Sequence, residues 1–135
     1  CGQRGCLETY LYGQRLLRRY ESHTGMHLDS VRDFFAYAAA GDPVALSMVG
    51  EAAGVIGTAV AMAATLLDLD LVVIGGLWGE LGDSLIQPVQ AKAVEILDCS
   101  GLDRAFAVRS SALGEDSDVL GAAGTVINRW FTPPI

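Results

Sequence analysis

Two short apolar segments with a helical stretch between them limit the folds open to this chain. Residues 69–76 (LDLVVIGG) form a continuous apolar run that ends in a glycine pair, which is typical of a strand buried on both faces. Residues 105–109 predict a second strand, and residues 82–97 predict a helix between the two. Strand, helix and strand in this order indicate a parallel sheet. Two parallel strands are too few to stand alone, so we expect further strands in a preceding part of the protein.

Helical periodicity covers most of the remaining chain. Apolar residues in the segment 7–20 recur at about 3.6 positions. A second helix begins after an N-cap at Asp29 or Ser30. A third begins at Asp42, which can accept from first-turn amides, and Pro43, which suits the first helical position. The predicted helices are residues 7–20, 31–40, 43–67, 82–97, with a kink or break at Pro88, and 118–130.

Composition and charge exclude several classes of protein. With 135 residues, of which 51% are hydrophobic and 19% charged, the chain forms one globular domain at most. Sixteen acidic residues against nine basic ones give a net charge of −7, which has the wrong sign for a nucleic-acid backbone. We therefore exclude nucleic-acid binding by this segment alone.

The cysteines and the apolar runs bear on the compartment. No basic region followed by an apolar run begins the chain, so nothing predicts secretion, and we expect the cytoplasm. There, three cysteines are more typical of thiols or metal ligands than of disulfides. The uncharged run between Glu51 and Asp68 is shorter than the ~20 residues that a bilayer span needs, so we predict a buried helix and no membrane contact.

The opening residues CGQRGCLE contain a candidate metal site. Cys1 and Cys6 flank two glycines, which permit the tight turns that bring two sulfurs to one ion. Two thiols are half a zinc site; His23 and His27 are further candidate ligands by residue type, and ordinary histidines otherwise. Glu8 lies at a predicted helix start, where a carboxylate is favoured in any case.

Gly75 and Gly76 form a second candidate site. They end a buried strand directly before a helix, where α/β folds bind nucleotides, because bare backbone approaches the ligand and helix amides face it. Packing alone also accounts for such a pair, and the residues leave both interpretations open.

These residues together resemble one family. The segment CGQRGCLE resembles the end of the zinc motif of the ROK family (repressors, open reading frames and sugar kinases), a His followed by Cys-x-Cys-Gly-x-x-Gly-Cys-x-Glu. Later stretches agree with that family in order and spacing. They are Gly41-Asp42-Pro43, Val72-Val73-Ile74-Gly75-Gly76, Gly82-Asp83 with Pro88, Leu113-Gly114 and Gly121-Ala122-Ala123.

The resemblance implies an α/β fold, the C-terminal lobe of an actin-like ATPase or sugar-kinase-like (ribonuclease H-like) fold. Such a lobe is helix-rich, has few strands and is incomplete without the upstream lobe. Within a single unit of residues 1–135, the resemblance implies a zinc-knuckle remnant at 1–8, a helical segment at 7–67 and a strand–helix–strand–helix segment at 69–131.

The resemblance also implies roles for the candidate residues. Cys1 and Cys6 would be two ligands of a structural zinc whose other ligands lie upstream. Glu8 would accept charge-assisted hydrogen bonds from a sugar hydroxyl. Gly75 and Gly76 would lie near the adenosine and phosphates of ATP if the protein is a kinase.

The family contains both kinases and transcriptional regulators, and the residues after the glycine pair favour a regulator. Kinases commonly have a third glycine where this chain has Leu77 and then Trp78, whose bulk hinders a nucleotide. The acidic residues Glu115, Asp116 and Asp118 oppose polyphosphate, although carboxylates also stabilise a helix N-terminus.

We therefore predict a non-enzymatic, sugar-sensing effector segment of a repressor. The alternative is the C-terminal half of an ATP-dependent, glucokinase-like sugar kinase, and a third possibility is a dimerisation domain without a ligand. The expected partners are a small sugar or sugar phosphate, and DNA only through a domain N-terminal to this chain. Uncovered apolar helices predict a homo-oligomer.

Overall fold

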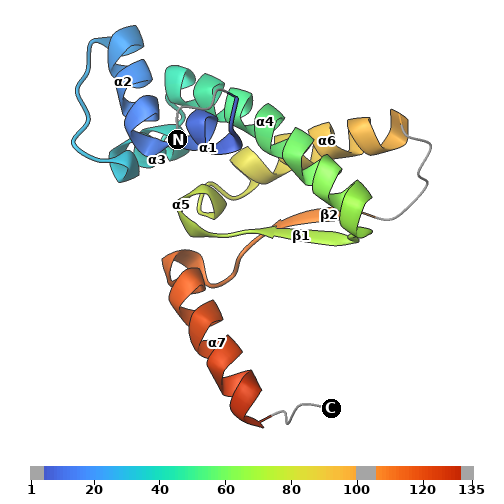
Figure 1. Ribbon diagram of the computed structural model, residues 1–135. Coiled ribbons are helices and arrows are strands. Elements are labelled where there is room, and N and C mark those ends of the chain that lie inside the picture. The colour runs from blue at the N-terminus through green and yellow to red at the C-terminus, as the bar shows by residue number, and fades with distance from the viewer. Residues whose placement is uncertain (1–4, 100–105, 132–135) are drawn as a thin grey trace.

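The computed structural model describes residues 5–99 and 106–131, which form seven α-helices, a 3₁₀ turn and two strands within those ranges. Helices gather on one side of a small sheet, and the last helix points away from the body (Figure 1). The elements in chain order are α1 (Leu7–Leu11), α2 (Gly13–Thr24), α3 (Val31–Ala39), α4 (Pro43–Leu67), β1 (Leu71–Ile74), α5 (Gly76–Gly79), α6 (Asp83–Cys99), β2 (Ala107–Ser110), η1 (Gly114–Asp116) and α7 (Ser117–Phe131).

The first predicted helix is two helices. Tyr12 has extended backbone angles (φ −64°, ψ 121°) and separates α1 from α2. The second helix runs to Thr24, beyond the predicted end at residue 20, and ends where Gly25 takes a left-handed φ of 71° and donates its N–H to the Glu21 carbonyl. An interruption of one residue is too short to be visible in the spacing of the apolar residues, so the sequence pattern did not reveal the division.

The caps of α3 and α4 follow from their sequences. Ser30, not Asp29, caps α3: its hydroxyl accepts from the Asp33 N–H at 3.2 Å, and the Asp33 carboxylate accepts from the Ser30 N–H at 2.9 Å. The Asp42 carboxylate accepts from the Ala45 N–H at 2.8 Å, and Pro43 occupies the first helical position of α4, as predicted.

Helix α4 is the centre of the core. Its most apolar window would suit a membrane span by length and composition, but 44% of that window is buried inside this protein. It packs chiefly along α6, and also against α3, α2 and α1. At the crossing, a Cβ on Gly57 would lie 2.9 Å from the Val89 carbonyl, so the two helices meet backbone to backbone. We conclude that α4 is the core helix of a globular unit.

An aromatic cluster fills the space between α2 and α3. Tyr20 and Phe34 are fully buried, and their rings meet edge to face with centroids 5.9 Å apart. Burial, together with the negative charge of the Asp42 carboxylate, raises the pKa of the Tyr20 phenol above 10.0. The Tyr20 phenol is therefore neutral in the native protein below pH 10. As the pH rises through the raised pKa, the folded protein has to ionise a buried group, and its free energy of unfolding falls.

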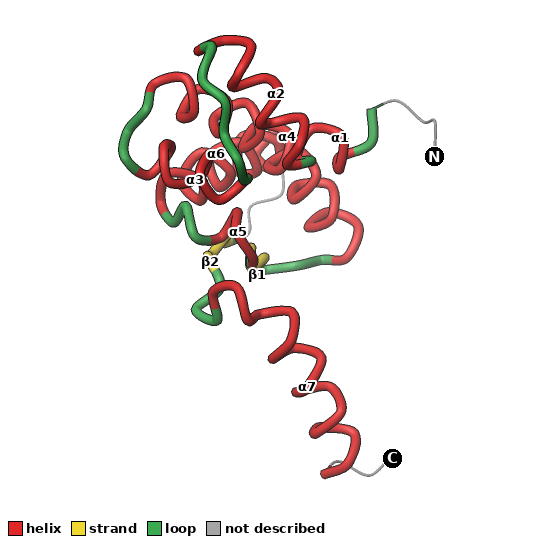
Figure 2. Tube along the Cα trace, turned by 90° about the vertical axis from the view of Figure 1, so that its left-hand side faces the viewer, coloured by secondary structure: helices red, strands yellow, loops and turns green. Residues whose placement is uncertain are grey.

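The sheet consists of β1 and β2 in parallel, with Leu71 opposite Ala107 and Ile74 opposite Ser110. The helices α4 and α6 cover one of its faces (Figure 2). On the other face, Leu71 and Val73 are 52% and 55% exposed. The prediction of a strand buried on both faces is thus wrong for β1 in this structure, because no described element covers the second face.

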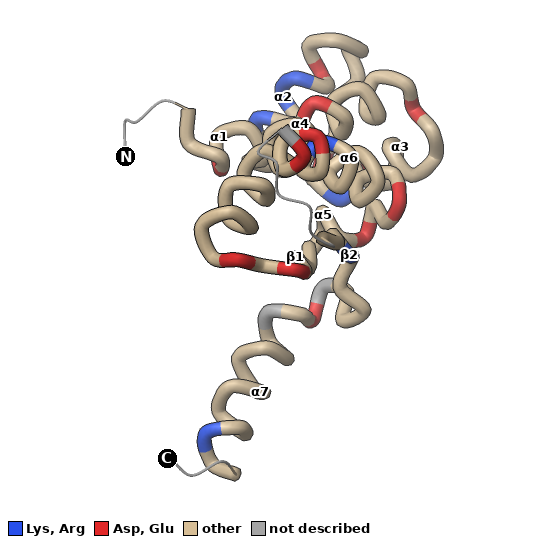
Figure 3. The backbone as a smooth tube through the Cα atoms, turned by 90° about the vertical axis from the view of Figure 1, so that its right-hand side faces the viewer, with Lys and Arg blue, Asp and Glu red and all other residues tan. Residues whose placement is uncertain are grey.

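Helix α7 leaves the body and carries an apolar stripe. Its sequence has Asp118 near the start and Arg129 in the last turn, and Figure 3 shows the basic residue near the end. Its large apolar side chains are exposed, and its main packing partner among the described elements is η1. The exposed stripe comprises Val119, Leu120, Val126, Ile127, Trp130 and Phe131.

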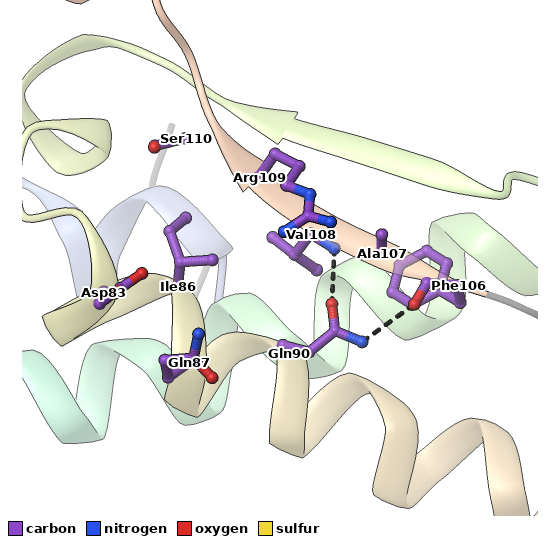
Figure 4. Close-up of a pocket in the computed structure, with 9 residues that line it drawn as sticks. All are labelled: Asp83, Ile86, Gln87, Gln90, Phe106, Ala107, Val108, Arg109 and Ser110. Atoms are coloured by element: carbon purple, nitrogen blue, oxygen red, sulfur yellow. Dashed lines mark hydrogen bonds between the residues drawn. The ribbon is translucent and has the colours of Figure 1, made fainter.

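Helix α6 continues through Pro88 without the predicted break. Pro88 lies early in the helix, where its missing N–H leaves only the Ser84 carbonyl without a helical donor. Continuation brings Gln90 to the free edge of β2 (Figure 4). There its Nε2 donates to the Phe106 carbonyl at 3.0 Å, and its Oε1 accepts from the Val108 N–H at 2.5 Å.

We expect the substitution Gln90→Ala to lower the free energy of unfolding by about 2 kcal/mol, because it leaves a half-buried carbonyl and a half-buried amide unpaired. Gln87→Ala is the matched control, one turn earlier on the same helix and exposed, for which we expect a change within about 0.5 kcal/mol. Urea denaturation followed by circular dichroism measures both. Equal losses in the two variants would contradict the role of Gln90.

Candidate functional site

The carboxyl ends of both strands meet at one edge of the sheet. The Ser111 N–H, just beyond β2, donates to the Ile74 carbonyl at the end of β1 at 2.8 Å. Helix α5 turns back on the same strand end, since a Cβ on Gly79 would lie 2.5 Å from the Ile74 carbonyl oxygen. The turn between β1 and α5 is therefore tightly closed, and it contains the predicted glycine pair.

Gly75 and Gly76 each require glycine, one for lack of space and the other for its backbone conformation. Gly76 has a φ of 62°, which side chains rarely adopt, and a Cβ there would meet open space. Gly75 is extended, but a Cβ there would lie 3.0 Å from the Ser117 Oγ and 3.6 Å from the Ser111 Cβ. Gly75 thus allows the strand end to touch the first residue of α7.

The start of α7 completes this edge. Gly114, with a φ of 56°, opens η1, and the Ser111 Oγ accepts from the Leu113 N–H at 3.1 Å in the loop before it. The Ser117 Oγ is buried and has no hydrogen-bond partner within the described residues. The 3₁₀ turn η1 runs directly into α7, and the Ser117 N–H donates to the Gly114 carbonyl, so the amides without a helical partner are those at the start of η1. Bare backbone and this helical start meet beside Gly75. Such an arrangement can bind an anion such as phosphate.

The bulky residues after the glycine pair do not face this edge. The Trp78 ring packs edge to face on Phe35 with centroids 5.0 Å apart, and Leu77 packs against the same core. The steric argument against a nucleotide loses its support, because both side chains are partly buried against the core. Asp116 is exposed at the end of η1, directly before α7, where a helix N-terminus stabilises a carboxylate.

Glu8 lies elsewhere, in the first turn of α1. Its side chain is exposed and makes no hydrogen bond or ion pair with another described residue. Helix α1 packs on α4 and α2, and Figure 2 shows it apart from α5. The structure thus leaves the Glu8 carboxylate free for a ligand but does not bring it to the glycine turn.

The predicted metal ligands are not assembled within the described part of the chain. Cys1 lies outside it; Cys6 is half-buried directly before α1 and forms no disulfide. His23 hydrogen-bonds the Arg19 carbonyl at 2.7 Å, and His27 lies 3.3 Å from the Glu21 carboxylate, so both have partners at the far end of α2. Residues 5–99 and 106–131 contain no cluster of three or more His, Cys, Asp or Glu side chains suited to a metal ion.

The fold of this chain, with the glycine turn after β1, is found in a known family of proteins. The chain superposes on a ROK family glucokinase from Streptomyces griseus, solved with glucose and AMPPNP, with a TM-score of 0.76 and 26% identity, over 93% of this chain and 45% of that one. It has the actin-like, sugar-kinase-type fold in part. The ROK family model matches residues 1–129, and the chain belongs to the ROK family.

Its curated relatives are sugar kinases. A glucokinase of Halalkalibacterium halodurans is 30% identical over 93% of this chain and 42% of its own length. An N-acetyl-D-glucosamine kinase of Yersinia pseudotuberculosis is 38% identical over 56% of this chain and 25% of its own length. The chain therefore spans less than half of the proteins that it matches.

These relatives correct two of our predictions. The predictions of a regulator and of a non-enzyme are both wrong, because the matched proteins are kinases. The bulky residues that argued against a nucleotide pack against the core. We expected a DNA partner only because we predicted a regulator, so nothing now supports that partner.

Proposed function

We propose that this chain is part of an ATP-dependent sugar kinase, which transfers the γ-phosphoryl group of ATP to a sugar hydroxyl. The observation that carries the proposal is the meeting of Gly75, Gly76 and the α7 N-terminus at the carboxyl edge of the sheet. Backbone amides there would hold the nucleotide's phosphates. The relatives, a glucokinase and an N-acetyl-D-glucosamine kinase, support the same class of substrate.

In this proposal Glu8 binds the sugar. Its exposed carboxylate, which has no partner within the described residues, can accept two hydrogen bonds from neighbouring hydroxyls. Cys1 and Cys6 would supply two thiolates of a structural zinc, with the remaining ligands from elsewhere in the protein. Zinc there would hold the start of α1, and so the backbone of Glu8, in place.

Two further features belong to the proposal. The remainder of a kinase is available to cover the exposed sheet face at Leu71 and Val73 and the apolar stripe of α7.

The unpaired thiol of Cys6 suits a reducing compartment, so we place the kinase in the cytoplasm. Self-association stays a prediction.

The test is ADP release by the complete protein that carries this chain, with ATP and either glucose or N-acetylglucosamine. We expect Gly75→Val to raise the KM for ATP at least about tenfold, because its side chain would push Ser117 and the start of α7 away from the turn. The KM for the sugar should change little.

Gly124→Ala is the control, since it adds a side chain on α7 itself, in open space. Its kinetics should match those of the parent protein. ADP release that does not depend on sugar, or no ADP release with any hexose, would contradict the proposal of a sugar kinase. A normal KM for ATP in Gly75→Val would overturn the assignment of the glycine turn.

A further inference from the structure

A polar cavity of about 390 Å³ lies outside the sheet, between α6 and the edge of β2 that faces away from β1. Figure 4 shows Asp83 and Gln87 on the helix side, with Arg109 and Ser110 on the strand side. The buried side chains of Ile86 and Val108 lie beneath them. The proposed kinase site uses none of these side chains.

The backbone of β2 presents an unused hydrogen-bonding pair to this cavity. Ala107 and Ser111 donate toward β1, to the carbonyls of Asp70 and Ile74. In a parallel strand the alternate residues therefore point outward. Gln90 takes two of their groups, the Phe106 carbonyl and the Val108 N–H, as a neighbouring strand would. The Val108 carbonyl and the Ser110 N–H come next along the edge, spaced to pair with one more peptide group.

The charges at the cavity are opposite in sign and unpaired. Asp83 and Arg109 stand on opposite sides of it in Figure 4, and neither side chain pairs with another residue in the part of the chain described. Asp83 begins α6, where the helix N-terminus favours its ionised form. A ligand that complements this cavity has a peptide-like donor and acceptor between a negative and a positive group.

We propose that the cavity binds an extended peptide segment of a partner protein, which adds to β2 as a short third strand. An acidic side chain of the segment pairs with Arg109 and a basic one pairs with Asp83. Strand addition supplies main-chain hydrogen bonds, and the two charges select the partner. Gln90 limits the added strand to the end of β2, because its amide already occupies the preceding ladder position.

The probes are two synthetic five-residue peptides, acetylated and amidated, with lysine, valine, threonine, glutamate and valine in this order and in the reverse, which places the two charges on opposite faces of the added strand. The reversed order covers either strand direction. We expect one of them to bind the complete protein saturably with a Kd of about 1 mM or below, since two charged pairs and two backbone bonds supply several kcal/mol. Calorimetry measures binding, and hydrogen exchange should slow at the Ser110 amide.

Arg109→Gln and Asp83→Asn should each weaken binding about tenfold, with the unfolding transition unchanged. Arg129→Gln, an exposed arginine on α7, is the matched control and should bind as the parent does. The same peptide N-methylated at its central amide should not bind. Failure of both orders, equal binding by Arg109→Gln, or protection away from residues 106–110 would overturn the proposal, whatever the outcome of the kinase assay.

Discussion

Replacing Gly57 by alanine is expected to lower the free energy of unfolding by about 2 kcal/mol. Gly57 lies where α4 crosses α6, and an added Cβ would lie 2.7 Å from the Lys92 Cβ and 2.9 Å from the Val89 carbonyl oxygen. The Lys92 Cβ and the Val89 carbonyl are both fixed by the α6 backbone, so the two helices must separate. That separation opens the core along the interface between α4 and α6.

Gly54→Ala is the matched control, three residues earlier on the same helix. A Cβ there would meet nothing within 4 Å, so the substitution gains helix propensity without a clash. We expect Gly54→Ala to raise the free energy of unfolding by about 1 kcal/mol. Urea denaturation should therefore shift in opposite directions for the two variants. A gain for Gly57→Ala would contradict the close approach of the helices.

Replacing Glu8 by glutamine in the complete kinase is expected to raise the KM for its sugar about 100-fold. The loss corresponds to two charge-assisted hydrogen bonds, together worth about 3 kcal/mol. Steady-state kinetics with the preferred hexose measures it, and the KM for ATP should stay within about twofold, because Glu8 lies on α1 and not at the glycine turn.

Glu95→Gln is the control, an exposed glutamate on α6 whose partner is Lys92 at 2.9 Å. It should leave both KM values unchanged. If Glu8 serves only as a helix N-terminal charge, Glu8→Gln will cost a few tenths of a kcal/mol of stability and leave the KM for sugar normal. That outcome would end the assignment of Glu8 to the sugar.

Sequence patterns predicted the helices well where local chemistry decides them. Asp42 and Pro43 start α4 because they satisfy and pre-shape its first turn. The glycine pair ends β1 for an equally local reason, the positive φ of Gly76. The short helix α5 was missed because four residues carry no measurable period.

The main error of the sequence analysis was the direction in which two side chains point. Leu77 and Trp78 are adjacent to the glycine turn in sequence, and from adjacency we inferred obstruction. Whether a residue beside a turn faces a ligand or the core depends on what packs against it, here Phe35 from α3. This wrong direction was one of the two arguments that favoured a regulator over a kinase, the other being the acidic residues Glu115, Asp116 and Asp118.

The sequence by itself determined the family, the parallel order of the two strands and the helices with strong caps, because motif spacing, periodicity and capping act over a few residues. Only the tertiary structure brought Gly75 against Ser117, Gln90 to the β2 edge and Gly57 onto α6. Those contacts join residues far apart in the chain, and they depend on how whole elements pack rather than on any local preference.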